Sequence, residues 1–164
     1  MKTLLLLRHA KSSWKDESLR DFDRPLTQRG IKAATRMGRF VRKRKLQPDL
    51  ILSSPAERAR ETTAVLIECS GLSAELRYDE RIYEASATRL LEVISQIEET
   101  AAVVMLVGHN PGFEELLESL TGENHNMSTA ALACIELNVE KWNKSRAGTG
   151  RLEWLMGPKD LKSG

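Results

Sequence analysis

The chain has 164 residues, of which 41% are hydrophobic and 29% are charged, and its 25 lysines and arginines nearly balance its 23 acidic residues. These values are typical of globular proteins, and they exclude disordered, collagen-like and coiled-coil chains. The formal net charge of only +2 gives no support to a nucleic-acid-binding or membrane protein. We therefore expect a single domain over residues 1–164.

The cysteines and the N-terminus favour a cytoplasmic protein. Cys69 and Cys134 lie far apart and form no CxxC pair, so we expect both to be reduced thiols in the core. The N-terminal apolar run stops at Arg8, which makes it too short for a secretory signal. No apolar stretch approaches the length of a membrane span, so we expect no membrane partner.

The first half of the chain predicts two strands, each followed by a helix. A short apolar run, Leu4–Leu7, is typical of a buried parallel strand. Apolar residues at helical spacing follow Thr27, which can cap a helix that ends in the basic run 42–45. A second strand, 49–53, leads into a helix that ends near Cys69.

The second half continues the alternation of strands and helices and then ends in strands alone. Residues 103–107 are its clearest strand, because five consecutive apolar residues there include three β-branched valines. The other predicted elements are a strand at 75–77, a loop at 79–86, an amphipathic helix at 87–99, a helix at 113–120, strands at 131–137 and 151–155, and a hairpin-type loop at 147–150.

This alternation predicts a three-layer α/β/α fold around a mainly parallel, mixed sheet of about six strands. We expect the two strands of the tail to extend an edge of the sheet, one of them antiparallel to the rest. Ligands of such sheets gather at the carboxyl ends of the strands. Residues directly after each strand are therefore the first candidates for a functional site.

Three predicted strands end in residues that suit an anion. The first ends in Arg8 and His9, Arg58 follows the second, and His109 follows the clear strand at 103–107. If these strands are parallel, all four side chains meet at one rim of the sheet. Two guanidiniums and two imidazoles need an anion to hold, and arginine forks match phosphate oxygens. The pattern predicts a pocket for a phosphoryl group.

Each of these residues also has a simpler structural explanation. A lone histidine after a strand often satisfies only a loop carbonyl, and Arg58 within 57–61 resembles a solvated helix charge. The histidines show no metal-ligand spacing, and Arg8 would oppose a cation, so we expect neither a metal nor another cofactor. The basic run at 39–45 lacks interleaved aromatic residues, which favours a solvated helix end over a nucleic-acid site.

Five motifs across most of the chain resemble the histidine phosphatase superfamily, which has the phosphoglycerate-mutase-like fold. They are Leu7–Ala10, with Ala10 in place of the usual glycine, and Pro25–Gly30, Ser53–Thr63, Asp79–Glu84 and Gly108–His109. Within the superfamily, the short chain, the turn at 108–112 and the ending at 150–158 are most similar to the SixA-type phosphohistidine phosphatases.

The resemblance implies a hydrolase with a covalent intermediate. His9 would attack phosphorus and become a phosphohistidine, which water then hydrolyses. Arg8, Arg58 and His109 would neutralise the phosphoryl oxygens, so that no metal is required. The joint presence of these four residues argues against a catalytically silent phosphate-binding or interaction module, which remains the alternative of another class.

Two positions leave the resemblance incomplete. Glu84 lies in the stretch that carries the family's acid, and it could protonate a leaving group, but Glu80 is a nearby rival. Some relatives have an asparagine that helps to hold the phosphate where this chain has Lys15. The contact would have to come from Ser12 or Ser13, or be absent.

The chain lacks room for the long insertions that cover the site in metabolite-processing relatives. We therefore expect the substrate to be phosphohistidine in a protein. A phosphatase of small metabolites, such as sugar or nucleotide phosphates, is the second interpretation. A mutase is the third, because it would need a pocket that retains the phosphorylated intermediate.

Overall fold

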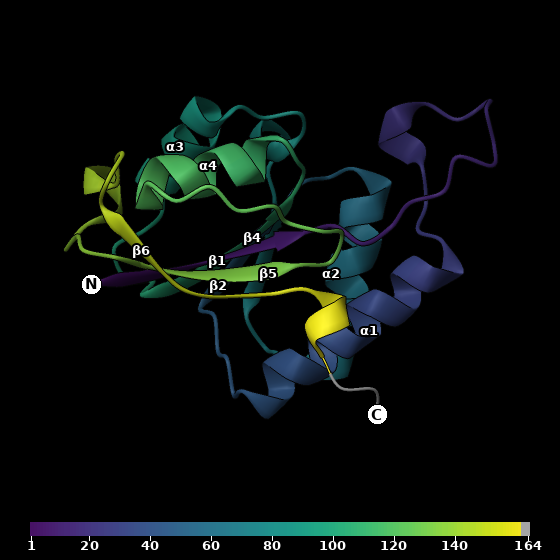
Figure 1. The fold of residues 1–164 in the computed structure, drawn as a ribbon, viewed down its shortest axis with the longest axis horizontal. Coiled ribbons are helices and arrows are strands. Elements are labelled where there is room, and N and C mark those ends of the chain that lie inside the picture. Colours follow the sequence, from purple (N-terminus) through teal and green to yellow (C-terminus); the bar gives the residue numbers. More distant parts are fainter. Residues whose placement is uncertain (162–164) are drawn as a thin grey trace.

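The computed structural model describes residues 1–161, and residues 162–164 of the predicted domain lie outside the described part. A six-stranded sheet lies between two layers of helices (Figure 1). Helices α1 (Gln28–Lys43) and α2 (Glu57–Ser70) cover one face, and α3 (Ala87–Ser95) and α4 (Gly112–Thr121) cover the other. The predicted three-layer α/β/α fold is confirmed.

The sheet is mixed, with the strand order β3-β2-β4-β1-β5-β6. Strands β1 to β4 are parallel, β5 pairs antiparallel with β1, and β6 pairs antiparallel with β5. Only β5 therefore runs against the others, as the sequence predicted for one strand of the tail. The strands are β1 (Lys2–Arg8), β2 (Leu50–Ser53), β3 (Glu75–Tyr78), β4 (Val103–Gly108), β5 (Leu132–Leu137) and β6 (Gly150–Met156).

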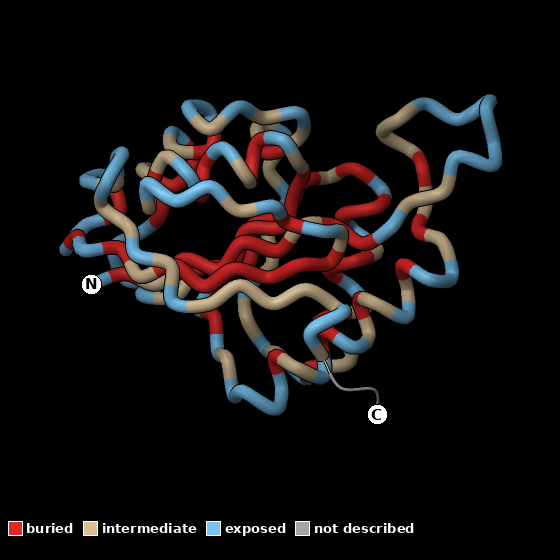
Figure 2. Tube along the Cα trace, viewed as in Figure 1, coloured by how far each residue is buried: buried red, intermediate tan, exposed pale blue. Residues whose placement is uncertain are grey.

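The central strand β1 supplies both cores of the molecule. Leu4 and Leu6 pack with the cluster under α3 and α4, whereas Leu5 and Leu7 pack with the cluster under α1 and α2. All four side chains are fully buried, and the red tubes of Figure 2 show this buried centre. Each such leucine contributes about 1.5–3 kcal/mol relative to an exposed side chain, which explains why a run of four specifies this strand.

Two helix caps agree with the sequence, one at the start of α1 beside the site and one at the end of α2 that lies away from it. The Thr27 side chain accepts a hydrogen bond from the backbone N–H of Gly30, which fixes the start of α1. Gly71 ends α2 in the left-handed conformation, with a φ of 73°. The Thr27 cap was predicted from the sequence.

Three local predictions differ from the structure. Helix α3 ends at Ser95 and not at residue 99, because Ile97 stays buried through tighter turns, such as its N–H bonding to the Ile94 carbonyl. The loop at 79–86 contains a short 3-10 helix, and the loop at 147–150 is only the end of a longer connection over 138–149. The short 3-10 helices are η1 (Asp21–Asp23), η2 (Glu80–Ile82), η3 (Trp142–Lys144) and η4 (Pro158–Asp160).

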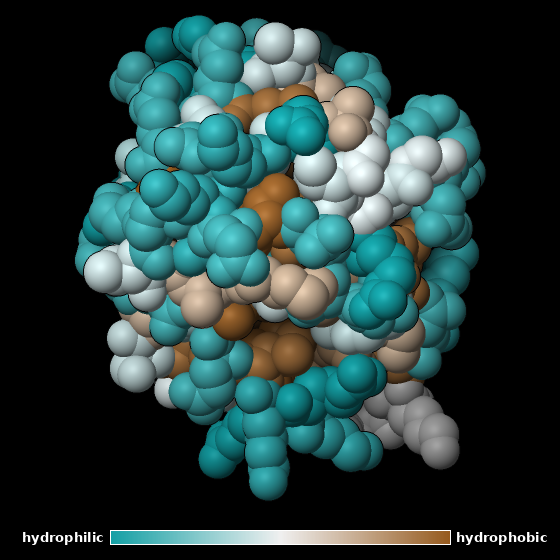
Figure 3. Space-filling model, turned by 90° about the vertical axis from the view of Figure 1, so that its left-hand side faces the viewer, coloured by the Kyte–Doolittle hydropathy of each residue, from teal (hydrophilic) through white to brown (hydrophobic). Residues whose placement is uncertain are grey.

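The two ends of the sheet have different surfaces. At the carboxyl end of β1, the segment that leads to α1 projects from the body of the protein, and its residues 14–20 are exposed (Figures 1 and 2). The end where β1 begins is mainly hydrophilic, and apolar side chains are visible in places between the polar ones (Figure 3). Within residues 1–161, no helix is long and apolar enough to cross a membrane.

Candidate active site

The carboxyl ends of neighbouring strands bring the four predicted residues together. Arg8 ends β1 and pairs in register with Gly108, which ends β4. The backbone N–H of His9 donates to the Gly108 carbonyl at 2.9 Å, and the rings of His9 and His109 lie 5.0 Å apart between centroids. Arg58 reaches the same place from the first turn of α2, and all four line one pocket of about 310 Å³.

His9 is held as a neutral ring with a defined orientation. Its Nδ1 lies 2.7 Å from the carbonyl oxygen of Ala10, and a carbonyl can only accept, so Nδ1 carries the proton. Burial lowers the pKa of His9 to about 4, and the positive charge of Arg58 acts in the same direction, against the opposing contact with Ala10. At neutral pH, therefore, Nε2 carries an unprotonated lone pair.

His109 is also held neutral, at the opposite side of the pocket. Its Nε2 lies 2.7 Å from Oγ of Ser54, which follows β2. Burial lowers the pKa of His109 to about 3, with further contributions from His9 and Arg58. Within the described residues, Nδ1 of His109 is buried without a hydrogen-bond partner, as is Nε of both Arg8 and Arg58. Unpaired buried polar atoms are costly. An anion bound in the pocket would supply hydrogen-bond partners to the residues that carry these three atoms.

Asp21, which we did not predict from the sequence, contacts the pocket residue Arg58. Its carboxylate Oδ2 accepts hydrogen bonds from Nη2 of Arg58 at 3.0 Å and from the hydroxyl of Tyr83 at 2.6 Å, and its backbone carbonyl accepts from Nη1 of Arg58 at 2.8 Å. Burial alone would raise the pKa of Asp21, but the hydrogen bonds from Tyr83 and Arg58 outweigh it and hold the pKa at about 2. The ionised carboxylate thus fixes the guanidinium of Arg58.

Arg24 is a further guanidinium of the pocket that we did not predict. Its side chain is buried, its Nε donates to Oδ1 of Asp21 at 3.1 Å, and its Nη1 donates to Oγ of Ser12 at 2.8 Å. Its guanidinium carbon lies 3.5 Å from the ring centroid of Trp14, in a cation–π contact. The available signal was its position directly before the Pro25–Gly30 motif.

The structure also shows where Lys15, which stands in place of the asparagine of some relatives, and the neighbouring serines lie. Lys15 is exposed and does not line the pocket, whereas Ser12 does. Ser13 is also outside the lining, and its Oγ accepts from the backbone N–H of Lys15 at 3.1 Å. Of the two serines that could replace the asparagine contact, only Ser12 is at the pocket.

The two candidate acids lie outside the pocket lining. Glu84 and Glu80 are both exposed, and Glu84 has a left-handed backbone with a φ of 53°. The Glu84 carboxylate is one of the groups around Tyr83: burial and the hydrogen bond to Asp21 raise the pKa of Tyr83 to about 12, and Glu84 adds to this. Glu84 therefore neighbours a residue of the site without lining the pocket.

The described residues contain no group of three or more histidine, cysteine, aspartate or glutamate side chains that could hold a metal ion. That the reaction needs no metal stays a prediction, which the assay with EDTA described below tests.

Comparison with known proteins assigns this arrangement to a family. The model of the histidine phosphatase superfamily (branch 1) matches residues 4–105, which is more than half of the chain. The chain belongs to the histidine phosphatase superfamily. This match spans the Arg8–His9 motif, the Arg58 segment and the candidate acids.

Individual relatives narrow the assignment. A crystal structure of a candidate phosphohistidine phosphatase SixA from Agrobacterium tumefaciens superposes with a TM-score of 0.83 at 32% identity, over 96% of this chain and 98% of that one. The phosphohistidine phosphatase SixA of Escherichia coli is 25% identical over 163 residues, 97% of this chain and 96% of its own. An uncharacterized chloroplastic protein of Arabidopsis thaliana is 33% identical over 170 residues, 96% of this chain and 78% of its own. The predicted phosphoglycerate-mutase-like fold is confirmed, and the protein is a SixA-like histidine phosphatase.

Proposed function

We propose that this phosphatase hydrolyses phosphohistidine in proteins, with His9 as the nucleophile. The observation that carries the proposal is the state of His9: its Nδ1 is committed to the Ala10 carbonyl, so Nε2 presents a lone pair in the pocket. The partly buried Arg8 and the buried Arg24 and Arg58 surround it with positive charge. This arrangement suits an attack on a phosphoryl group.

The reaction proceeds in two steps. In the first, Nε2 of His9 forms a bond to phosphorus while the bond between phosphorus and the leaving nitrogen breaks. The leaving imidazole takes up a proton from solvent. In the second, water attacks phosphorus, the bond to Nε2 breaks, and inorganic phosphate leaves with His9 restored. Arg8, Arg58 and His109 hold the phosphoryl oxygens in both steps, so that positioning and charge supply most of the rate acceleration.

The position of the candidate acids supports a phosphoramidate substrate. Expulsion of an alkoxide from a phosphate ester needs a proton in the transition state, whereas imidazole is a far better leaving group. Neither Glu84 nor Glu80 lines the pocket. Among residues 1–161, no aspartate or glutamate lines the pocket, which suits cleavage of a P–N bond better than cleavage of an alkyl ester.

A phosphatase of small metabolites is the second candidate. The pocket volume of about 310 Å³ lies within the range of small-molecule sites, so it could accept a sugar phosphate. A substrate panel separates the two candidates: a protein phosphorylated on histidine, several sugar phosphates and several nucleotides, each assayed with and without EDTA. We expect the highest kcat/KM for the phosphohistidine protein, and no effect of EDTA.

The same panel tests the nucleophile. His9→Ala should abolish turnover, and rapid trapping of the wild type at neutral to alkaline pH should find phosphate on His9. His125→Ala is the matched control, because His125 lies in a polar loop, paired with Glu123 at 3.1 Å, and should retain full activity. Label found only on other residues would contradict the mechanism. A higher kcat/KM for a metabolite would contradict the proposal that the substrate is phosphohistidine in a protein. Loss of activity with EDTA and its recovery with zinc or manganese would contradict the prediction that no metal is needed.

A further inference from the structure

A basic groove adjoins the pocket. It has a volume of about 300 Å³ and is open to solvent beside the N-terminal half of α1. Lys11 and Thr129 line both the groove and the pocket, so the two are continuous. Five exposed cations line the groove, namely Lys11, Arg29, Lys32, Arg36 and Lys159.

The groove has a fixed position relative to His9. Arg29, Lys32 and Arg36 recur at helical spacing on one side of α1, and Lys159 lies on η4, which packs beside this helix. The backbone N–H of Thr27 donates to the Lys11 carbonyl at 2.9 Å. The start of α1 is thus attached to the loop that follows His9.

The cations of the groove lack acidic partners. Among residues 1–161, none of the five forms an ion pair, whereas other arginines, such as Arg81 and Arg151, are paired with a nearby carboxylate. Asp160 follows Lys159, but its carboxylate accepts from the backbone N–H of Gly157 at 2.8 Å. The chain as a whole carries a net charge of only +2. The five cations of the groove therefore form a local concentration of positive charge that the net charge does not reveal.

We propose that this groove binds an acidic segment of the protein substrate, an inference that rests on the proposed function. Residues 29 to 36 span about 10 Å along the helix, which matches about three residues of extended chain. Charges spread over this length suit several carboxylates better than one additional phosphate. Among residues 1–161, no aromatic side chain lines the groove, which disfavours a single-stranded nucleic acid as the ligand.

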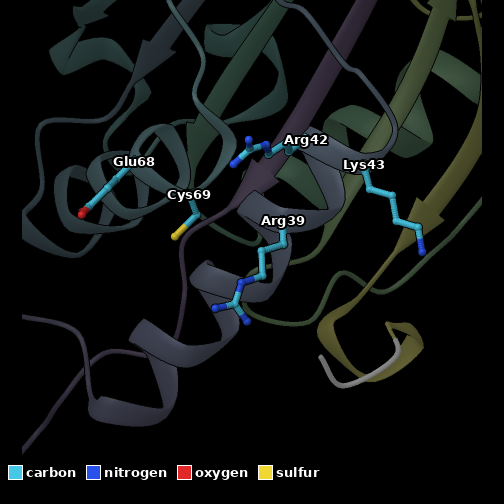
Figure 4. A pocket seen from close by; sticks show the side chains of 5 residues that line it. All are labelled: Arg39, Arg42, Lys43, Glu68 and Cys69. Carbon is cyan, nitrogen blue, oxygen red and sulfur yellow. The ribbon is translucent and has the colours of Figure 1, made fainter.

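A second hollow on the same helix supplies a matched control. It is lined by Arg39, Arg42 and Lys43 of α1 and by Glu68 and Cys69 of α2, and Figure 4 shows these side chains. The triple variant Arg29→Gln/Lys32→Gln/Arg36→Gln removes three charges from the groove. The triple variant Arg39→Gln/Arg42→Gln/Lys43→Gln removes three charges from the second hollow.

The first measurement is binding, which does not depend on turnover. A fluorescent peptide of eight glutamates is titrated into the wild type and both variants at low salt, with an eight-glutamine peptide as the neutral probe. We expect the groove variant to bind the acidic peptide at least about tenfold more weakly than the wild type. The control variant should change the affinity by less than about threefold, and salt should weaken wild-type binding.

The second measurement is turnover of a small substrate, phosphoimidazole, beside a histidine-phosphorylated protein with an acidic surface. In the groove variant, kcat/KM should fall about tenfold or more for the protein and by less than twofold for phosphoimidazole. Three results would each overturn the proposal that the groove binds an acidic segment. They are equal losses of kcat/KM in both variants, no affinity of the wild type for the acidic peptide, and tighter groove-dependent binding of an oligothymidylate. A wild type that binds the peptide but hydrolyses neither phosphoramidate would instead overturn the proposed function alone.

Discussion

The pocket and the groove use the same residue types in opposite states. In the pocket, Arg24 and Arg58 are each only 6% exposed and are fixed by the carboxylate of Asp21. In the groove, the arginines and lysines are exposed, and within residues 1–161 they have no ion-pair partner. Fixed charges stabilise a transition state without reorganising during the reaction, whereas exposed charges act at longer range and are screened by salt. In the function proposed for the pocket and the recognition inferred for the groove, burial and pairing therefore separate catalysis from recognition along one continuous surface.

The largest expected effect would come from removing a fixed charge. Arg58→Ala should lower kcat/KM for every substrate by roughly 10³-fold or more, the scale of an arginine that neutralises a transferring phosphoryl group. Arg58→Lys should restore little, because a single ammonium nitrogen lacks the planar fork by which Nη1 and Nη2 reach the carbonyl and the carboxylate of Asp21. The assay uses phosphoimidazole, with thermal unfolding to check the fold.

Arg60→Ala is the control for this variant. Arg60 lies two residues later on the same helix, is exposed, and stacks on Tyr78 with its guanidinium carbon 4.1 Å from the ring centroid. We expect its kcat/KM to stay within about threefold of the wild type. If Arg58→Ala lost no more than Arg60→Ala, the contrast between fixed and exposed charge would be wrong.

A smaller effect is expected at Glu84, which lies at the border of the site. Glu84→Gln should slow hydrolysis of an alkyl phosphate ester by roughly 10²-fold, the lower end of general-acid catalysis, because the carboxylate is outside the pocket lining. Phosphohistidine hydrolysis should change little. Equal losses on both substrates would instead assign Glu84 to orienting the nucleophile or water. No loss on the ester would direct attention to Glu80→Gln.

The last prediction concerns stability and tests the burial of the pocket. The pKa values of His9 and His109 are about 4 and about 3, below the ordinary value of 6.5. Between pH 6.5 and pH 4 the unfolded chain therefore binds protons that the folded protein does not bind. The free energy of unfolding should decrease as the pH falls through this range, by about 3–4 kcal/mol between pH 7 and pH 5.

Urea unfolding at pH 7 and pH 5 measures this difference directly. His9→Asn should reduce the pH dependence, because one of the two depressed histidines is removed. His125→Asn is the matched control, because His125 lies outside the buried pocket. An unfolding free energy that is equal at both pH values in the wild type would show that the pocket histidines are not desolvated.

The predictable parts of the molecule are those with local causes. The run Leu4–Leu7 predicts a central strand because four leucines need burial on both faces, and the Thr27 cap depends on a hydrogen bond within four residues. Arg8, His9 and His109 could be brought together because each lies at the end of a parallel strand. Their convergence follows from the topology of the sheet alone.

The unpredicted parts depend on contacts between distant segments. Asp21 stands in a polar loop whose sequence shows only alternating charges, and the one signal for Arg24 is its position directly before Pro25. Asp21 enters the site because it meets Arg58 from a separate helix and Tyr83 from a separate loop. Helix α3 ends early for a similar reason, because Ile97 is buried by tertiary packing after the helix has stopped. Neither outcome has a signal in the neighbouring residues.

One close backbone approach, between Gly30 and Lys11, fixes the distance between the pocket and the groove. A Cβ atom at Gly30 would lie 2.2 Å from the carbonyl oxygen of Lys11, so only glycine lets the helix of the groove approach the loop that follows His9 this closely. The interval between the pocket and the groove is therefore set by the backbone and does not adjust to the partner. In the inferred recognition by the groove, a substrate protein binds most tightly when the spacing between its phosphoryl group and its acidic residues matches this interval.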